Sequence, residues 1–340
     1  MTSSPPVHRE LPIGITMGCP AGIGPEIILK SVTALSETAL PPLVVIGDGK
    51  VLERCGRELG MPAAIKYWQP GMVPEKGVLN LYSLSSFGPE LRWGHPDGET
   101  GRAMGRYIEE TVKLIQQGTL GALVTCPISK AALNQGGYRF PGHTEMLASL
   151  CAAEEYAMMM AGEKLRVALV TIHIALAEVP GLITREAVAR IIGIVGRSLE
   201  TDFAISQPRI AVAGLNPHGG EGGLFGVEER EAIAPAVAEA AGKGWRVSGP
   251  WPPDTVFYQA ARGNFDAVVC MYHDQGLIPF KLLHFEDGVN VTLGLPLVRT
   301  SVDHGTAYDI AGKGVASPAS LISAFRLAAR IVNNRLQKGK

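Results

Sequence analysis

Short apolar runs alternate with helix-like stretches along almost the whole chain. The apolar runs lie at 13–17, 41–48, 121–128, 166–174, 209–217 and 265–273. A stretch with helical spacing of its apolar residues follows most of these runs, and residues 317–337 form a long closing helix by the same criterion. Continuous apolar strands separated by helices are typical of a mainly parallel sheet that is covered on both faces. We therefore predict an α/β fold.

The length and composition narrow the class of protein. A chain of 340 residues is longer than one hydrophobic core usually serves, so we expect two α/β/α domains. The expected boundaries are 1–145 plus 295–340 for the first domain and 146–294 for the second. Hydrophobic residues make up 46% and charged residues 19%, with a net charge of -1. This balance argues against nucleic acid or a membrane as the partner.

The five cysteines are scattered at 19, 55, 126, 151 and 270, and none forms a C-x-x-C pair. An odd, unpaired set favours reduced thiols, and therefore a cytoplasmic protein. It also argues against a cysteine-rich zinc site.

Three histidines occupy matching places in the strand–helix pattern. His173 lies late in "ALVTIHIAL", His218 follows "IAVAGLNP", and His273 follows "AVVCMY". Ligands of such sheets bind beyond the carboxyl ends of the strands, and three imidazoles with an open fourth position form a common divalent-metal site. The alternative is that each histidine is an ordinary polar residue at a strand end.

Two glycine-rich loops also follow predicted strands. "NPHGGEGGLFGVEE" carries five glycines between 219 and 226, which suits either a flexible lid or a close-fitting ligand wall. "MGCPAGIGPEI" (17–27) opens a predicted helix as a phosphate-binding loop would, or forms a structural tight turn. It matches neither the dinucleotide fingerprint, since Ile27 stands where a third glycine belongs, nor a P-loop.

Several longer motifs resemble one enzyme family. They are "ITMGCPAGIGPEI", "VTCPISKAALNQGGYRFPGHTEMLA", "LNPHGGEGG", "PPDTVF", "MYHDQGLIPFK" and "VNVTLGLPLVRTSVDHGTAYDIAGKG". Together they resemble 4-hydroxythreonine-4-phosphate dehydrogenase of pyridoxal phosphate biosynthesis, over about residues 12–330 in the family's order. The resemblance implies NAD as cofactor and the fold of the isocitrate and isopropylmalate dehydrogenases. It places NAD in the first domain, and the metal and a homodimer interface in the second.

The resemblance also implies site residues. The family's metal ligands fall on His173, His218 and His273, with His273 supplied by the partner subunit to an active site at the subunit interface. Zinc, magnesium, manganese or cobalt would suit such a site. The remaining family positions, taken in order along this sequence, bind the substrate or lie near the metal. They are His143, Thr144, Asp254, Lys281, Asn290 and Arg299.

The residue types agree with oxidation of a phosphorylated β-hydroxy acid followed by decarboxylation. Lys281 and Arg299 supply positive charge for a phosphate or carboxylate, or are solvated surface charges. Asp254, which matches the family's carboxylate near the metal, or Asp274 can take up a proton or orient an imidazole. Asp254 can alternatively cap a helix.

A weaker correspondence concerns the cofactor. His304, Thr306 and Asp309 match a segment that lines the adenosine side of NAD in the decarboxylating relatives. The alternative is that this glycine-rich segment only organises the fold.

The first glycine loop departs from the family pattern. Cys19 stands where the family carries aspartate, and Cys126 and Ser129 stand where alanine and asparagine are usual. Four functions therefore remain open: the threonine-phosphate enzyme; a paralogue that oxidises D-erythronate 4-phosphate, D-threonate 4-phosphate or an aromatic dihydrodiol; a metal-free phosphate acyltransferase; and a non-catalytic binding protein. Lys281, Asn290 and Arg299 favour a phosphorylated substrate over a dihydrodiol.

We expect the change Cys19→Asp to raise turnover of 4-phosphohydroxy-L-threonine, because it returns a carboxylate to a loop where the family has one. The measurement is the kcat of NADH formation for the variant and the natural chain. A folded but inactive variant would mean that the loop has diverged at further positions.

Overall fold

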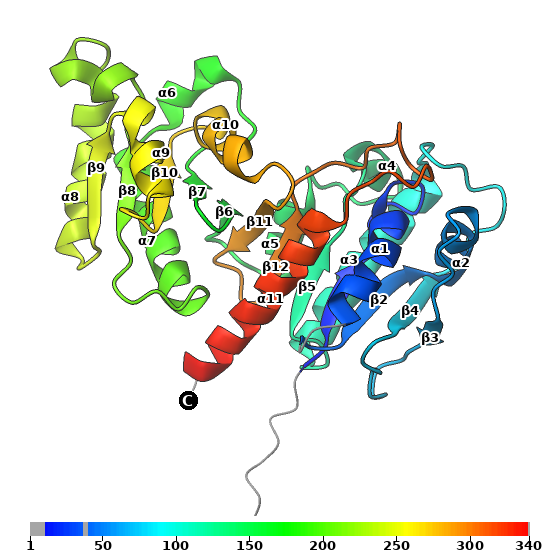
Figure 1. Cartoon of the computed structure of the whole chain (residues 1–340). Coiled ribbons are helices and arrows are strands. Elements are labelled where there is room, and N and C mark those ends of the chain that lie inside the picture. The colour runs from blue at the N-terminus through cyan, green and yellow to red at the C-terminus, as the bar shows by residue number, and fades with distance from the viewer. Residues whose placement is uncertain (1–10, 37–39, 339–340) are drawn as a thin grey trace, which may run out of the picture. The chain divides into compact units, whose positions relative to one another are not determined.

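The computed structural model describes residues 11–36 and 40–338. The chain divides into two compact units, 1–147 with 304–329 and 148–303 with 330–340. Each contains a β-sheet and is called here unit 1 or unit 2 (Figure 1). No helix in the described part of the chain combines the length and apolarity needed to cross a membrane. All five cysteines are free thiols.

Unit 1 has a fully parallel sheet in the order β3-β4-β2-β1-β5. Its strands are β1 (Ile13–Thr16), β2 (Leu43–Asp48), β3 (Ile65–Tyr67), β4 (Leu79–Ser85) and β5 (Ala122–Thr125). Its helices are α1 (Gly24–Ser36), α2 (Gly49–Glu58), α3 (Gly98–Gln116) and α4 (Lys130–Gln135). Two further helices begin in unit 1 and end in unit 2, namely α5 (His143–Leu150) and α11 (Ala319–Lys338).

Unit 2 has a mixed sheet in the order β12-β11-β6-β7-β10-β8-β9. Its strands are β6 (Ala157–Ala161), β7 (Arg166–Leu169), β8 (Ile210–Ala213), β9 (Val247–Trp251), β10 (Ala267–Cys270), β11 (Val289–Leu293) and β12 (Arg299–Val302). Its α-helices are α6 (Val179–Leu182), α7 (Arg185–Thr201), α8 (Ala234–Gly242), α9 (Pro253–Ala261) and α10 (His273–His284). Its short helical turns are η1 (Leu176–Glu178), η2 (Pro217–Gly223) and the π-helical η3 (Glu229–Ile233).

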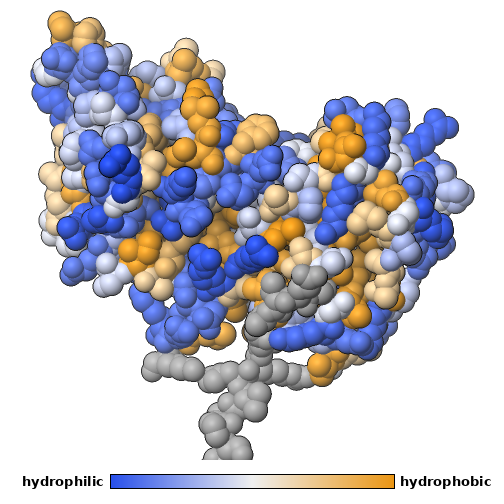
Figure 2. All heavy atoms as spheres, in the orientation of Figure 1, coloured by the Kyte–Doolittle hydropathy of each residue, from blue (hydrophilic) through white to orange (hydrophobic). Residues whose placement is uncertain are grey.

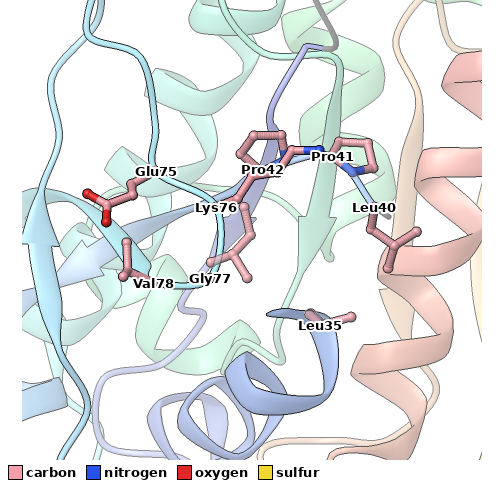
Figure 3. A pocket seen from close by; sticks show the side chains of 9 residues that line it. Leu35, Leu40, Pro41, Pro42, Glu75, Lys76, Gly77 and Val78 are labelled. Carbon is pink, nitrogen blue, oxygen red and sulfur yellow. The ribbon is translucent and has the colours of Figure 1, made fainter. Parts of the chain in front are cut away.

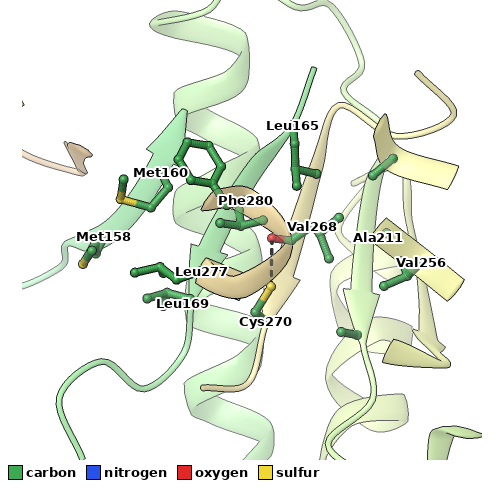
Figure 4. Close-up of a cluster of buried hydrophobic side chains, with 13 residues drawn as sticks. Met158, Met160, Leu165, Leu169, Ala211, Val256, Val268, Cys270, Leu277 and Phe280 are labelled. Carbon is green, nitrogen blue, oxygen red and sulfur yellow. Dashed lines mark hydrogen bonds between the residues drawn. The ribbon is translucent and has the colours of Figure 1, made fainter. Parts of the chain in front are cut away.

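Strands β7, β10, β8 and β9 of unit 2 are parallel, whereas β6, β11 and β12 pair antiparallel. A cluster of buried side chains covers one face of this sheet (Figure 4). Val268 and Cys270 of β10 contribute from the strands, and Leu277 and Phe280 contribute from α10. This packing fixes α10 against the strand that it follows.

The predicted α/β class is confirmed, with a sheet that is parallel except for β6, β11 and β12. The strands are shorter than the apolar runs, because β7 ends at Leu169 and β10 at Cys270. The sequence analysis missed α3, and it missed the strands that lack a long apolar run, including β3, β9 and β12. A four-residue strand such as "RTSV" carries too little periodicity to be recognised.

The predicted boundaries, 1–145 plus 295–340 and 146–294, differ in detail from the division into units. Residues 295–303 belong to unit 2, because β12 pairs with β11 of that unit. The end of α11 also belongs to unit 2, where Arg335 forms two hydrogen bonds with the buried Asp202 at 2.6 and 3.1 Å. The functions assigned to the two domains stay predictions.

A small pocket in unit 1 lies near the start of β2 and β4 (Figure 3). Pro41 and Pro42 line it from one segment, and Glu75 and Val78 line it from another. The pocket therefore lies at the amino-terminal edge of these parallel strands, opposite the edge where ligands of such sheets bind.

Glu26 in α1 holds the first glycine loop and the segment before α11 together. Its carboxylate accepts hydrogen bonds from Ala316 N at 2.7 Å, Gly314 N at 3.2 Å and Lys30 Nζ at 2.8 Å. Lys30 Nζ also donates to the carbonyls of Gly314 and Ala316. Only 1% of Glu26 is exposed, so water cannot replace these bonds.

We expect Glu26→Gln to lower the free energy of unfolding by roughly 1–3 kcal/mol, because it weakens two backbone contacts and leaves Lys30 without its carboxylate. Chemical denaturation measures the change. The exposed Glu163→Gln is the control, for which we expect a change near zero. Equal stability of the two variants would contradict the role given to Glu26.

Candidate active site

Three neighbouring parallel strands of unit 2 end at the same edge of the sheet. Strand β10 pairs with β7 on one side and with β8 on the other (Figure 1). The loop after β7 carries His173, the loop after β8 carries His218, and α10 begins with His273 directly after β10. The expected placement of the three histidines beyond neighbouring strand ends is therefore observed.

His173 and His273 lie side by side. Their ring centroids are 5.7 Å apart and the ring planes are inclined by 40°. His173 lies in the loop beyond β7, and not late in the strand as the sequence analysis expected, because the chain leaves the sheet after Leu169. Two imidazoles at this separation can bind a common ion or a common anion.

Asp274 orients the ring of His273. Its Oδ1 lies 2.7 Å from His273 Nδ1. Because this contact occupies Nδ1, the other ring nitrogen, Nε2, is left to bind a ligand. A carboxylate behind an imidazole is the usual second partner of a metal-binding histidine.

His218 lies on a left-handed backbone segment. Residues 218–223 all have positive φ, and two of them, His218 (φ 53) and Glu221 (φ 45), are not glycines. Side chains other than glycine rarely adopt this conformation, and such strain clusters at functional sites. His218 Nδ1 is 3.9 Å from Asp254 Oδ2 in the first turn of α9. The N-cap of α9 is Pro252 and Asp254 lies inside the first turn, so Asp254 is not the capping residue.

A buried carboxylate holds this glycine loop in place. Glu229, in the π-helical turn η3, accepts hydrogen bonds from Asn216 N at 2.7 Å and from Asn216 Nδ2 at 2.9 Å. Asn216 Nδ2 also donates to Glu228 at 2.8 Å. The pKa of Glu228 is lowered by a hydrogen bond from the backbone amide of Glu228 itself and, next, by the hydrogen bond from Asn216. These bonds hold the start of the glycine loop in place, and its role as a ligand wall or a lid stays a prediction.

The donor set suits a divalent metal, but one chain does not complete a three-ligand site. Among residues 11–36 and 40–338, no three His, Cys, Asp or Glu side chains are grouped so that they could hold a metal ion. One chain does bring two imidazoles together, and it places a third imidazole, with its own carboxylate, after the neighbouring strand. Which subunit supplies each imidazole stays a prediction.

Arg299 and Asn290 face each other across the β11–β12 pair. Arg299 Nη1 donates to Asn290 Oδ1 at 3.3 Å and to Thr292 Oγ1 at 3.0 Å. Arg299 is buried, with 3% of its surface exposed. It is therefore not a solvated surface charge, and the structure adds Thr292 as a third member that the sequence analysis did not single out.

Lys281 lies on α10 near a second carboxylate that the sequence analysis missed. Lys281 Nζ is 3.8 Å from Asp303 Oδ1. Burial raises the pKa of the Asp303 carboxyl, against the lowering effects of Lys281 and His273. The ammonium, the carboxyl and His273 thus belong to one charged neighbourhood of unit 2.

His143 and Thr144 belong to unit 1, where they form the first turn of α5. The backbone amides of a helix's first turn point outward and lack helical partners, so this position suits an anionic group. Both side chains are half-buried.

The segment with His304, Thr306 and Asp309 packs against the first glycine loop of unit 1. Ile23 N donates to Thr306 O at 3.3 Å, and a Cβ on Gly22 would lie 3.3 Å from that oxygen. Tyr308 Oη donates to the buried Cys19 Sγ at 3.3 Å. Burial raises the pKa of the Cys19 thiol, and Tyr308 acts in the opposite sense, so the position is neutral where the family carries a negative charge.

The comparison with known proteins identifies the family of the chain. Residues 39–328 match the family described as "Pyridoxal phosphate biosynthetic protein PdxA". The chain belongs to the PdxA family. A protein of Desulfosudis oleivorans named 4-hydroxythreonine-4-phosphate dehydrogenase is 54% identical over 324 residues, covering 93% of this chain and 94% of the relative. The chain is accordingly an oxidoreductase.

Two further relatives carry names with different substrates. A protein of Cupriavidus necator named D-threonate 4-phosphate dehydrogenase is 46% identical, covering 95% of this chain and 98% of the relative. The crystal structure of 4-hydroxythreonine-4-phosphate dehydrogenase from Klebsiella pneumoniae has a TM-score of 0.86 and 41% identity, covering 96% of this chain and 99% of that chain. The chain therefore shares the fold of a solved 4-hydroxythreonine-4-phosphate dehydrogenase.

Proposed function

We propose that this PdxA protein oxidises 4-phosphohydroxy-L-threonine with NAD and a divalent metal, and then decarboxylates the 3-keto acid to 3-amino-2-oxopropyl phosphate. The observation that carries the proposal is the set of three histidines beyond the neighbouring strands β7, β10 and β8. The 54% identical relative supports the choice of substrate.

The histidines and their carboxylates would hold the metal. The imidazoles of His173, His218 and His273 are the ligands, and zinc, cobalt, manganese or magnesium is the ion. When bound, such an ion supplies Lewis acidity at the substrate oxygen. Asp274 keeps His273 Nε2 directed to the ligand, as its 2.7 Å contact with Nδ1 indicates.

The proton and the hydride leave the substrate by separate routes. The exposed carboxylate of Asp254 accepts the hydroxyl proton, and a bound NAD would supply the acceptor for the hydride on the same carbon. The carbon–carbon bond to the carboxylate then breaks and carbon dioxide leaves. The Lys281 ammonium, close to Asp303, donates the proton that the resulting enolate carbon takes up.

Substrate recognition depends on the fixed charges and donors. Arg299, whose guanidinium is held by Asn290 and Thr292, binds the phosphate or carboxylate of the substrate. His143 and Thr144 supply further hydrogen-bond donors. His304, Thr306 and Asp309 line the adenosine side of NAD, where the glycine loop packs against their segment.

The outer face of α10 supports a homodimer with the active site at the subunit interface. Ile278, Leu282 and Phe285 are 61%, 82% and 77% exposed on or just after this helix. Figure 2 shows hydrophobic surface over α10. Large exposed apolar side chains beside a candidate site indicate a protein interface. We place the protein in the cytoplasm, where its five free thiols would stay reduced.

A second candidate is the oxidation of a four-carbon sugar-acid phosphate, D-threonate or D-erythronate 4-phosphate. The D-threonate 4-phosphate dehydrogenase relative, 46% identical, favours it. We expect the neutral thiol of Cys19 in the first glycine loop to determine which of the two classes of substrate the protein prefers.

The test is NADH formation by purified, metal-supplemented protein. Separate assays contain 4-phosphohydroxy-L-threonine, D-erythronate 4-phosphate and D-threonate 4-phosphate. Turnover of the first alone supports the proposed function, and preference for a sugar acid supports the second candidate. No NADH from any of the three would contradict both.

We expect His218→Ala to lose bound metal and activity together, because it removes one of three ligands. Metal content is measured by elemental analysis and kcat by NADH formation. The control is His95→Ala, an exposed histidine of unit 1. Normal turnover of His218→Ala would refute the ligand assignment.

We expect Arg299→Ala to raise KM about tenfold to a hundredfold for a phosphorylated substrate, since a hydrogen bond to a charged group contributes about 1.5–3 kcal/mol. Arg299→Lys retains the charge but not the planar donor pair, so its KM should lie between the KM of the natural chain and that of Arg299→Ala. Steady-state kinetics with phosphorylated and unphosphorylated analogues measures the effect. An equal rise in KM for both analogues would argue against a phosphate contact.

A further inference from the structure

A chain of buried hydrogen bonds connects the three chain segments that carry the histidines, namely the loop after β7, the start of α10 and the loop after β8. Thr171 donates to the carbonyl of Met271 through its backbone N at 3.2 Å and through Oγ1 at 2.8 Å. Met271 N donates to Gln275 Oε1 at 2.7 Å. Gln275 Nε2 donates to the carbonyl of Gly214 at 2.7 Å. The bonds therefore cross from the loop after β7, through the end of β10, to the loop after β8.

Each end of this chain of bonds lies close to a histidine along the sequence. Thr171 and Met271 each precede a histidine, His173 and His273, by two residues. Gly214 begins the loop that leads to His218, and its own N donates to Trp251 O at 2.8 Å. A shift in any of these bonds would move the corresponding imidazole.

A side chain takes over on the β8 side of β10, where the backbone pairing ends, and Thr171 Oγ1 reinforces a backbone bond on the β7 side. The last paired residues of β10 are Val269 with Val212 of β8, and Cys270 with Leu169 of β7. Beyond them, the amide of Gln275 accepts from one backbone and donates to the other, as a peptide group in a sheet does. Thr171 and Gln275 are each only 7% exposed, so water does not compete for these bonds.

We propose that Gln275, together with Thr171, is a positioning residue that fixes the relative placement of His173, His218 and His273. Both polar atoms of the Gln275 amide are engaged by backbone groups, so its action on a ligand passes through the loops. This inference rests on the metal site proposed above. It gives the glutamine of "YHDQG" a function that glutamate and leucine cannot supply, since glutamate lacks the donor and leucine lacks both groups.

The test compares Gln275→Glu and Thr171→Val with two matched controls in unit 1. Gln275→Glu keeps the acceptor for Met271 N and loses the donor to Gly214 O. The control Asn80→Asp changes a buried amide that likewise accepts from a backbone N, that of Glu75, and donates to backbone carbonyls, those of Leu43, Glu75 and Val78. Thr111→Val removes one buried hydroxyl that donates to Tyr107 O at 2.7 Å, as Thr171→Val does for Met271 O.

The measurement is Co²⁺ binding to the metal-stripped full-length protein, followed by its visible absorption spectrum, with melting temperature and kcat recorded in parallel. We expect Gln275→Glu and Thr171→Val to weaken Co²⁺ binding at least about tenfold and to alter the spectrum, as changes behind metal ligands do. The controls should bind Co²⁺ like the natural chain, even where their melting temperatures fall. A Gln275→Glu protein with the same Co²⁺ affinity and spectrum as the natural chain would overturn the proposal. If Gln275→Glu does not fold, the same comparison with Thr171→Val tests the proposal instead.

If the natural chain itself binds no Co²⁺, the metal site fails, and hydrogen–deuterium exchange decides the positioning role separately. Faster exchange of peptides from 214–226 and 270–276 in the Gln275→Glu or Thr171→Val protein, but in neither control, would support it. Unchanged exchange in these peptides would overturn it.

Discussion

The candidate site depends on the parallel pairing of β7, β10 and β8. Parallel strands bring their carboxyl ends to one edge, so residues that follow three separate strands lie along that edge although 45 and 55 positions separate the histidines along the chain. The core beneath, formed by α10 and the strands, holds this edge rigid (Figure 4). An antiparallel neighbour in place of β10 would direct His273 to the opposite edge.

Backbone geometry limits which residues can follow β8. A run of positive φ values from 218 to 223 requires glycine at most positions, and here four of the six residues are glycine. The strain at His218 persists because the surroundings determine it, through Glu229 and Asn216 on one side and Gly214 on the other. A stiff loop of this kind suits a ligand that must be held in one geometry.

In unit 1, one buried carboxylate likewise holds two segments together. Glu26 closes the glycine loop onto the segment 304–316, and Cys19, Tyr308 and Thr306 meet in that contact. The same contact contains the departure from the family pattern. A thiol that receives a hydrogen bond from Tyr308 occupies the place of a carboxylate, so the charge of this region is altered while its fold is kept.

Local sequence determined the strand–helix order, the α/β class and the three histidines as candidates, because apolar runs and the residues that follow them are read along the chain itself. The family resemblance, and not the local pattern, supplied Lys281, Asn290 and Arg299 as candidates. The motifs also determined the family. Tertiary structure alone decided that His173 lies beside His273 and that Asp274 rather than Asp254 contacts a histidine ring closely. It also decided that Thr292 contacts Arg299 and that Asp303 lies near Lys281. It alone revealed Thr171, Gln275 and Glu229, since a polar residue looks the same in sequence whether it faces water or bridges two loops. Contacts between residues far apart in the chain depend on strand order and burial, which no local pattern encodes.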